Sequence, residues 1–266
     1  MGRLGLCLVL ILLVAAVFGP WLAPFDPFLI DVSAKFQPPS FPHLLGTDNL
    51  GRDILSRLIA GSWIAMGVGM STVLVALVLG LILGLIAGYG PRWLDYLLML
   101  VLDAVYAVPT VVMGLTVVTL LGPSLTTLMI VVIVILVPGY ARLARTATLS
   151  MKSEEFIVAL ESLGASRARI ILVHLLPNIA GPILIVASMD IPTVIALEAG
   201  LTYLGMGVPP PTPSWGRILQ EGFAQIGDAP WIIVAGGLPL IMVTLGFTFV
   251  GESLRDRLDP RLRAPR

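Results

Sequence analysis

The stretch SEEFIVALESLGASRARIILVHLLPN, residues 153–178, is a charged, helix-forming insertion between long apolar segments. Phe156, Leu160 and Leu163 recur at i, i+4 and i+7, which places them on one stripe of a short amphipathic helix. Glu154 and Glu155 fall on other faces of that helix. The stretch is too charged to lie in lipid, so we expect it to lie at a membrane surface.

A turn divides this stretch into two helices. Gly164 is the residue type that ends a helix in a left-handed C′ position, and Ser166 is a favourable N-cap for the helix that follows. Pro177 would break or kink that second helix. The sequence therefore predicts a helix–turn–helix elbow over residues 153–178.

Composition assigns the chain to the integral membrane proteins. Of its 266 residues, 57% are hydrophobic and only 12% are charged, whereas a soluble domain has roughly 45–50% apolar residues. The net charge is zero, so the composition does not indicate a nucleic-acid partner. The single Cys7 lies in an apolar segment and says nothing about the compartment.

Six apolar segments are each long enough to cross about 30 Å of hydrocarbon. The first is interpreted as a retained span, because interfacial aromatic residues extend it past the 7–15-residue core typical of a signal peptide, which is the alternative. Gly80, Gly84 and Gly88 recur every four residues in the second span, so we expect close packing against a neighbouring helix. The predicted spans are residues 4–25, 58–91, 94–121, 125 to about 140, 170–204 and 229–251.

The fifth span is the predicted pore lining. Pro177, Pro182 and Pro192 interrupt it, and irregular backbone at membrane depth is tolerated only against protein or a water-filled cavity. The third span contains Asp103 and Pro109.

The distribution of basic residues predicts the orientation. With six spans and the amino terminus inside, only Lys35, Arg52, Arg57 and Arg217 of the 16 Lys and Arg residues lie outside. This excess of internal positive charge predicts that both termini and the elbow are cytoplasmic. Residues 26–60 and 205–228 are then exterior loops, and residues 252–266 form a cytoplasmic tail.

The first exterior loop ends in a turn-rich motif, LGTDNLGRDILSR, residues 45–57. Gly46 and Gly51 flank the turn, and Asp48, Arg52 and Asp53 are close enough in sequence to form a local ion-pair cluster. On physical grounds alone, the motif is also compatible with an ordinary solvated loop.

Four segments together resemble one family. The elbow is similar to the EAA coupling loop of ABC-importer permeases, with Ala159, Gly164 and Leu176-Pro177 at the family spacing. It departs from the motif at Val158, Leu160 and His174. Residues 45–57, 198–216 and 251–263 resemble signatures of C-type permeases of the dipeptide, oligopeptide and nickel branch.

The resemblance implies an all-α membrane protein with the six-helix type I ABC-importer permease fold. It divides the chain into a first transmembrane helix (1–25), an exterior loop (26–60) and a core permease domain (61–266). The expected partners are a homologous B-type permease, two ATP-binding subunits or one fused ATPase, an exterior substrate-binding protein and membrane lipid. The chain would form half of the translocation pathway for peptides.

The resemblance also implies site residues. Those expected to couple to the ATPase are Glu154, Glu155, Phe156, Ala159, Leu160, Leu163, Gly164 and Ala165. Those expected in exterior docking loops are Gly46, Thr47, Asp48, Gly51, Arg52, Asp53, Pro213 and Trp215.

The chain itself is not expected to bind ATP. A P-loop needs Gly-Lys followed by Ser or Thr, and neither Lys35 nor Lys152 follows a glycine. ATP and magnesium are therefore expected in partner subunits, and this chain is expected to carry no cofactor, metal or catalytic residue.

Asp103, Asp190 and Glu198 are intramembrane carboxylates, each either a pathway residue or a partner in helix packing. They also leave open an ion-coupled secondary transporter that works alone. An intramembrane hydrolase is disfavoured, because His43 and His174 do not lie at membrane depth. Nickel or another small solute remains an alternative to peptides as the substrate.

Overall fold

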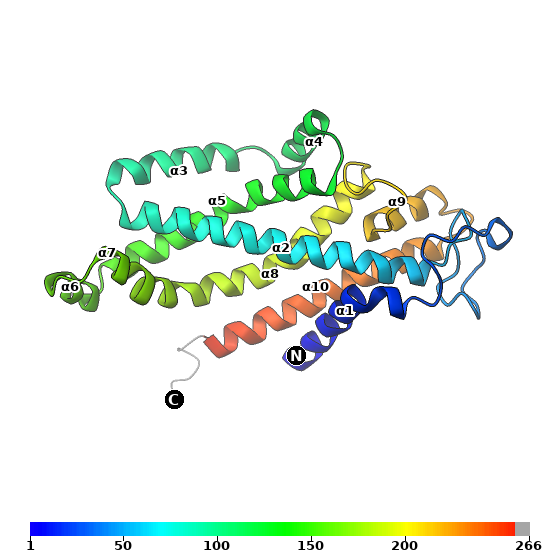
Figure 1. Cartoon of the computed structure of the whole chain (residues 1–266), viewed down its shortest axis with the longest axis horizontal. Coiled ribbons are helices and arrows are strands. Elements are labelled where there is room, and N and C mark those ends of the chain that lie inside the picture. Colours follow the sequence, from blue (N-terminus) through cyan, green and yellow to red (C-terminus); the bar gives the residue numbers. More distant parts are fainter. Residues whose placement is uncertain (259–266) are drawn as a thin grey trace.

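The computed structural model describes residues 1–258, and its regular elements are helices. The long helices lie side by side, with the elbow at one end of the bundle and the loop between α1 and α2, together with α9, at the other (Figure 1). In chain order the elements are α1 (Gly2–Leu22), η1 (Val32–Ala34), α2 (Ile54–Tyr89), α3 (Arg92–Tyr106), α4 (Thr110–Leu121), α5 (Leu125–Lys152), α6 (Glu155–Ser162), α7 (Arg167–Arg169), the π-helical η2 (Ile170–Leu175), α8 (Leu176–Tyr203), α9 (Trp215–Ala224) and α10 (Trp231–Leu258).

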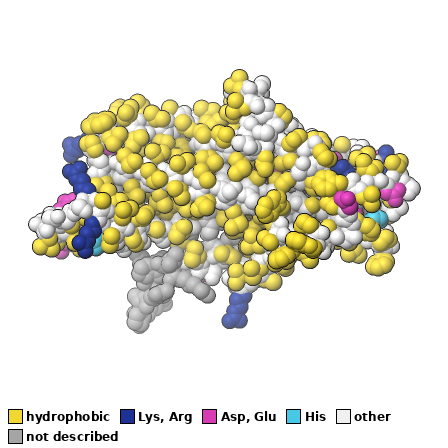
Figure 2. Space-filling model, viewed as in Figure 1, with side chains coloured by type: hydrophobic (Ala, Val, Ile, Leu, Met, Phe, Trp, Pro, Cys, Tyr) yellow, Lys and Arg dark blue, Asp and Glu magenta, His cyan; other side chains and the backbone are white. Residues whose placement is uncertain are grey.

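Five of these segments are long and apolar enough to cross a membrane, and there is a sixth if the bent pair of α3 and α4 counts as one span. The surface agrees with this reading: hydrophobic side chains cover the middle of the molecule, and most charged side chains gather towards its two ends (Figure 2). The start of α1 lies against the end of α10, because a Cβ on Gly2 would come within 2.5 Å of Ser253 Oγ. The six-span prediction therefore matches the helices in number and order.

The third span is not the continuous helix that the sequence predicts. It breaks between α3 and α4, whose axes are bent by 85°. Pro109 precedes the first residue of α4, and a proline disfavours helical backbone in the residue before it. The chain therefore changes direction within the apolar segment.

Several predicted boundaries are wrong. The second span begins at Ile54, inside the predicted exterior loop 26–60, because the Asp53 side chain caps α2 by accepting from the Ser56 N–H. The fourth span continues to Lys152 instead of ending near Tyr140. The sixth also extends past Gly251 to Leu258, so the predicted tail begins as helix, and residues 259–266 of the tail lie outside the described residues.

The prediction that prolines interrupt the fifth span is wrong. Pro182 and Pro192 lie inside the continuous helix α8, and Pro177 lies in its first turn. The irregularity lies just before Pro177, where residues 170–175 form a π-helix. The wider turn of a π-helix can accommodate Pro177, which has no backbone N–H to donate to the preceding turn.

The glycine repeat of α2 packs against α5, as predicted. A Cβ on Gly84 would lie 2.5 Å from the Ala141 carbonyl oxygen and 2.5 Å from Ala144 Cβ. A Cβ on Gly88 would lie 2.8 Å from Thr148 Cβ. Only glycine allows the two backbones to approach this closely, and such contacts are a main source of helix association in lipid.

Gly84→Val should destabilise the α2–α5 pair by about 1–3 kcal/mol, because an overpacked helix contact forces backbone shifts. Thermal unfolding in detergent should show a lower midpoint. The matched control is Gly67→Ala on the same helix, where an added Cβ meets nothing within 4 Å. An unchanged midpoint for Gly84→Val would contradict the assigned contact.

Candidate functional site

The elbow turns through a glycine-based helix cap. Gly164 has φ +78°, its N–H donates to the Glu161 carbonyl at 3.0 Å, and the Ala165 N–H donates to the Leu160 carbonyl at 3.0 Å. This pair of bonds is the Schellman motif. The Ser166 side chain then caps the Arg169 N–H, so the predicted turn and N-cap are both present.

The elbow helix α6 is anchored mainly by residues outside the predicted apolar stripe. Ile157 is fully buried in a small cluster with Tyr89, Ile170 and Leu175. The Tyr89 hydroxyl donates to Glu161 Oε1 at 2.7 Å. The sequence showed Ile157 only as an apolar residue off the predicted stripe. Ile157 anchors α6 partly through its contact with Tyr89 at the end of α2, which is distant in sequence.

The predicted stripe is mostly exposed. Phe156 is 43% exposed and Leu163 is 84% exposed, whereas Leu160 is half-buried against the anchoring cluster. The remaining residues of the predicted coupling set are the exposed Glu154, Glu155, Ala159 and Gly164 and the half-buried Ala165. The elbow therefore presents an apolar face outward while Ile157 holds its other side.

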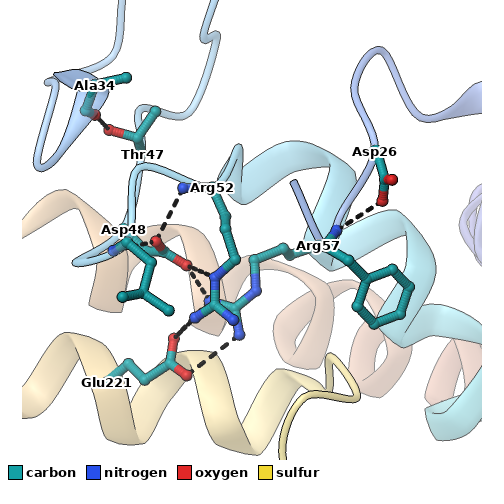
Figure 3. A network of polar contacts seen from close by, with 9 residues as sticks. Asp26, Ala34, Thr47, Asp48, Arg52, Arg57 and Glu221 are labelled. Atoms are coloured by element: carbon teal, nitrogen blue, oxygen red, sulfur yellow. Dashed lines mark hydrogen bonds and ion pairs between the residues drawn. The ribbon is translucent and has the colours of Figure 1, made fainter. Parts of the chain in front are cut away.

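The opposite end of the bundle contains a buried ion network (Figure 3). Asp48 is completely buried, and its Oδ2 accepts from Arg52 Nε at 2.7 Å and from Arg57. Arg57 in turn contacts Glu221 Oε2 of α9 at 2.5 Å. The interpretation of this motif as a solvated loop is wrong, because the network is buried and joins residues 48–57 to α9. Asp53 pairs with His43 at 3.0 Å.

The residues predicted for exterior docking lie largely inside the protein. Trp215 is fully buried and its Nε1 donates to the Leu58 carbonyl at 3.0 Å. A buried side chain cannot touch a docked protein, so these residues can only shape the loops that carry them, and docking of a binding protein on those loops stays a prediction. The buried members of the predicted set are Gly46, Thr47, Asp48, Gly51, Arg52, Asp53, Pro213 and Trp215.

Helix α9 and its Glu221 were not anticipated, because the prolines around Trp215 indicated an irregular loop. A local signal was present, since Ser214 precedes the helix and caps the Arg217 N–H. The exposed apolar residues of the exterior loops lie elsewhere, notably Phe41 at 94% and Leu44 at 58% exposure.

The three predicted intramembrane carboxylates have different surroundings. Asp103 forms an exposed pair with Arg142 at 2.7 Å. Glu198 is fully buried and accepts from the Thr202 hydroxyl at 2.9 Å, which supports a role in packing. Asp190 accepts from the Tyr140 hydroxyl at 2.7 Å and lines a cavity of about 470 Å³ beside the α3–α4 break.

Metal ligands do not gather in the described part of the chain. Within residues 1–258 there is no group of three or more His, Cys, Asp or Glu side chains that could hold a metal ion.

A bundle with six crossings, a surface elbow and a cavity among its helices defines a multi-pass membrane transport subunit. Residues 80–264 match the family described as binding-protein-dependent transport system inner membrane component. Residues 1–39 match the N-terminal transmembrane domain of oligopeptide transport permease C. The chain therefore belongs to the binding-protein-dependent inner-membrane permeases.

Similar proteins have consistent names. The chain is 37% identical over 260 residues to a dipeptide transport system permease of Alkalihalophilus pseudofirmus, covering 98% of this chain and 86% of that protein. It is 36% identical to a di/tripeptide transport system permease of Pseudomonas aeruginosa, covering 97% and 88%. It is 38% identical to a glutathione transport system permease of Escherichia coli, covering 96% and 84%.

A solved structure supports the fold. A chain of the inward-facing MetNI methionine ABC transporter aligns with a TM-score of 0.63 and 17% identity, covering 77% of this chain and 98% of that one. The predicted ABC-importer permease fold is therefore confirmed.

Arg57→Gln should destabilise the exterior end by about 3–5 kcal/mol, because it leaves the buried Asp48 carboxylate with one cationic partner fewer. Thermal unfolding in detergent measures the loss. Asp26→Asn is the control, because Asp26 is an exposed loop residue that accepts one local hydrogen bond from the Phe28 N–H. We expect Asp26→Asn to change stability by less than about 0.5 kcal/mol, and equal effects of the two variants would refute the network's importance.

Proposed function

We propose that this permease forms half of the translocation pathway of an ATP-driven importer for peptides. The names of the similar permeases, which are dipeptide, di/tripeptide and glutathione systems, support the substrate class. The second half of the pathway is a homologous B-type permease. The chain itself catalyses no reaction, and ATP and magnesium bind to two ATP-binding subunits or to one fused ATPase.

The observation that carries this proposal is the elbow's outward apolar face on an anchored helix. Phe156 and Leu163 are exposed, whereas Ile157 is buried and Glu161 is held by Tyr89. A short amphipathic helix with this pattern fits an apolar groove of a partner. Because α6 follows α5 and leads through η2 into α8, a push on it would act on two membrane-crossing helices at once.

The orientation follows from the elbow and from the basic residues near it. We place both termini and the elbow in the cytoplasm, in line with the excess of Lys and Arg on that side. The exterior binding protein then meets the opposite end, where Phe41 and Leu44 are exposed. The buried ion network stiffens this surface without contacting the partner.

Transport by the reconstituted importer tests the function. Vesicles that contain this chain with its partner permease, ATPase and binding protein should take up a labelled dipeptide only when ATP and the binding protein are both present. Uptake by this chain alone, driven by an ion gradient, would favour the secondary transporter instead.

Leu163→Asp and Phe156→Asp should abolish ATPase docking without affecting folding, because both residues are exposed in the isolated chain. Each substitution removes most of an apolar contact whose burial contributes about 1.5–3 kcal/mol to binding. It also places a charge in the groove of the partner. Co-purification of the ATPase subunits should fall at least about tenfold, while the unfolding midpoint stays unchanged.

Val158→Asp is the matched control for this experiment. Val158 is also exposed, at 52%, but it lies about 140–160° around the helix from Phe156 and Leu163, given 3.6 residues per turn. It should keep ATPase binding within about twofold of the wild type. Equal loss in all three variants would mean that the proposed face is not the docking face.

A further inference from the structure

One acidic side chain lies near the middle of a membrane-crossing helix and belongs neither to the elbow nor to the buried ion network. Asp190 is near the middle of α8, where an ionisable residue is expensive and marks a ligand pathway or a structural partner. Within residues 1–258 its hydrogen-bond partner is Tyr140, which donates to one carboxylate oxygen at 2.7 Å. The second oxygen has no such bond, so the carboxylate keeps capacity for a ligand.

Asp190 shares its cavity with the break in the third span. The lining includes Ala107, Val108 and Pro109 of the break and Thr110 at the start of α4. Irregular backbone is tolerated at membrane depth where it lines a water-filled cavity or is buried in protein. The carboxylate and the helix break are independent features, and both place polar groups in a largely apolar space among α3, α4, α5 and α8.

The cavity suits a ligand that carries a cation with several N–H donors. A lone carboxylate next to a phenol hydroxyl lacks the ligand number that a metal ion needs. An ammonium group can donate to the free carboxylate oxygen and to a hydroxyl such as that of Tyr140. A peptide with a free amino terminus carries such a group at neutral pH.

We propose that Asp190 binds the α-ammonium group of the peptide during its passage and that Tyr140 positions the carboxylate. This inference rests on the proposed function. Tyr140 is only 2% exposed and packs against Gly80 of α2, so its hydroxyl is held in a fixed place. The site lies where helices that continue from the two sides of the elbow, α5 and α8, meet.

Transport stoichiometry in vesicles that contain the complete importer gives the first test. Asp190→Asn should lower the amount of free-amine dipeptide imported per ATP hydrolysed by about tenfold or more, because a charge-assisted hydrogen bond is lost. ATP hydrolysis stimulated by loaded binding protein should stay within about twofold. Tyr140→Phe should give a smaller loss, and Asp190→Glu should recover part of the activity.

Ser188→Ala is the matched control on the same helix. The Ser188 hydroxyl donates to the Ile185 carbonyl at 2.7 Å, and Ser188 is absent from the cavity lining. Import per ATP should be unchanged in this variant. Wild-type import by Asp190→Asn, or equal loss in Ser188→Ala, would overturn the proposal.

A protection experiment tests the ammonium group directly. Val186 lines the cavity, and Cys7 is the native cysteine of this chain, so Val186→Cys in a Cys7→Ser background gives one reactive thiol in the chain. In the assembled importer without binding protein, millimolar dipeptide with a free amine should slow alkylation of this thiol at least about threefold. The N-acetylated dipeptide should not, and adding Asp190→Asn should remove the protection.

Equal protection by both dipeptides, or no protection by either, would overturn the ammonium assignment. Failure of the proposed function gives a different result. In that case the wild-type importer takes up no dipeptide, and dipeptide-loaded binding protein does not stimulate ATP hydrolysis.

Discussion

The close approach of α2 and α5 at Gly80, Gly84 and Gly88 is the contact on which the rest of the structure depends. In lipid, helices gain little from hiding apolar surface, so they associate where backbones can touch. Here the glycine stripe faces residues from Tyr140 to Thr148 of α5. Since α5 continues directly into the elbow, the stripe fixes both the position of Tyr140 and the place where the elbow leaves the membrane.

The two ends of the bundle are held in different ways, and this difference suits a transport cycle. At the end of the bundle opposite the elbow, Asp48 and Arg57 tie the loop before α2 to Glu221 of α9 through ion pairs. At the other end, α6 is held chiefly by Ile157 and by one hydrogen bond to Tyr89. Under the proposed function, a load applied at the elbow would move α5 and α8 against the end of the bundle that the ion network ties together.

Local signals in the sequence predicted much of this arrangement. Gly164 and Ser166 predicted the turn, because helix caps depend on a few adjacent residues. The four-residue spacing of glycines predicted that the second span packs closely against a neighbouring helix, which the structure shows to be α5. The pairing of Arg57 with Glu221 was beyond prediction, since 164 residues separate them. Ile157 was missed because its burial depends on other elements, namely Tyr89 of α2 and Ile170 and Leu175 of η2, and not on the pattern of its own helix.

The prediction that the fifth span lines the pore rested on prolines that do not break its helix. Prolines in the fifth span indicated irregular backbone, yet α8 is continuous through Pro182 and Pro192. Neighbouring helices can satisfy the backbone groups that a proline frees, so prolines are tolerated in membrane helices. The helix that does break is the third span, where α3 ends at Tyr106 and α4 begins at Thr110, with the two axes bent by 85°. A break of this kind must line a cavity or be buried in protein. Here it lines the same cavity as Asp190 of the fifth span. The fifth span therefore lines the cavity through a side chain, while the third span supplies the irregular backbone.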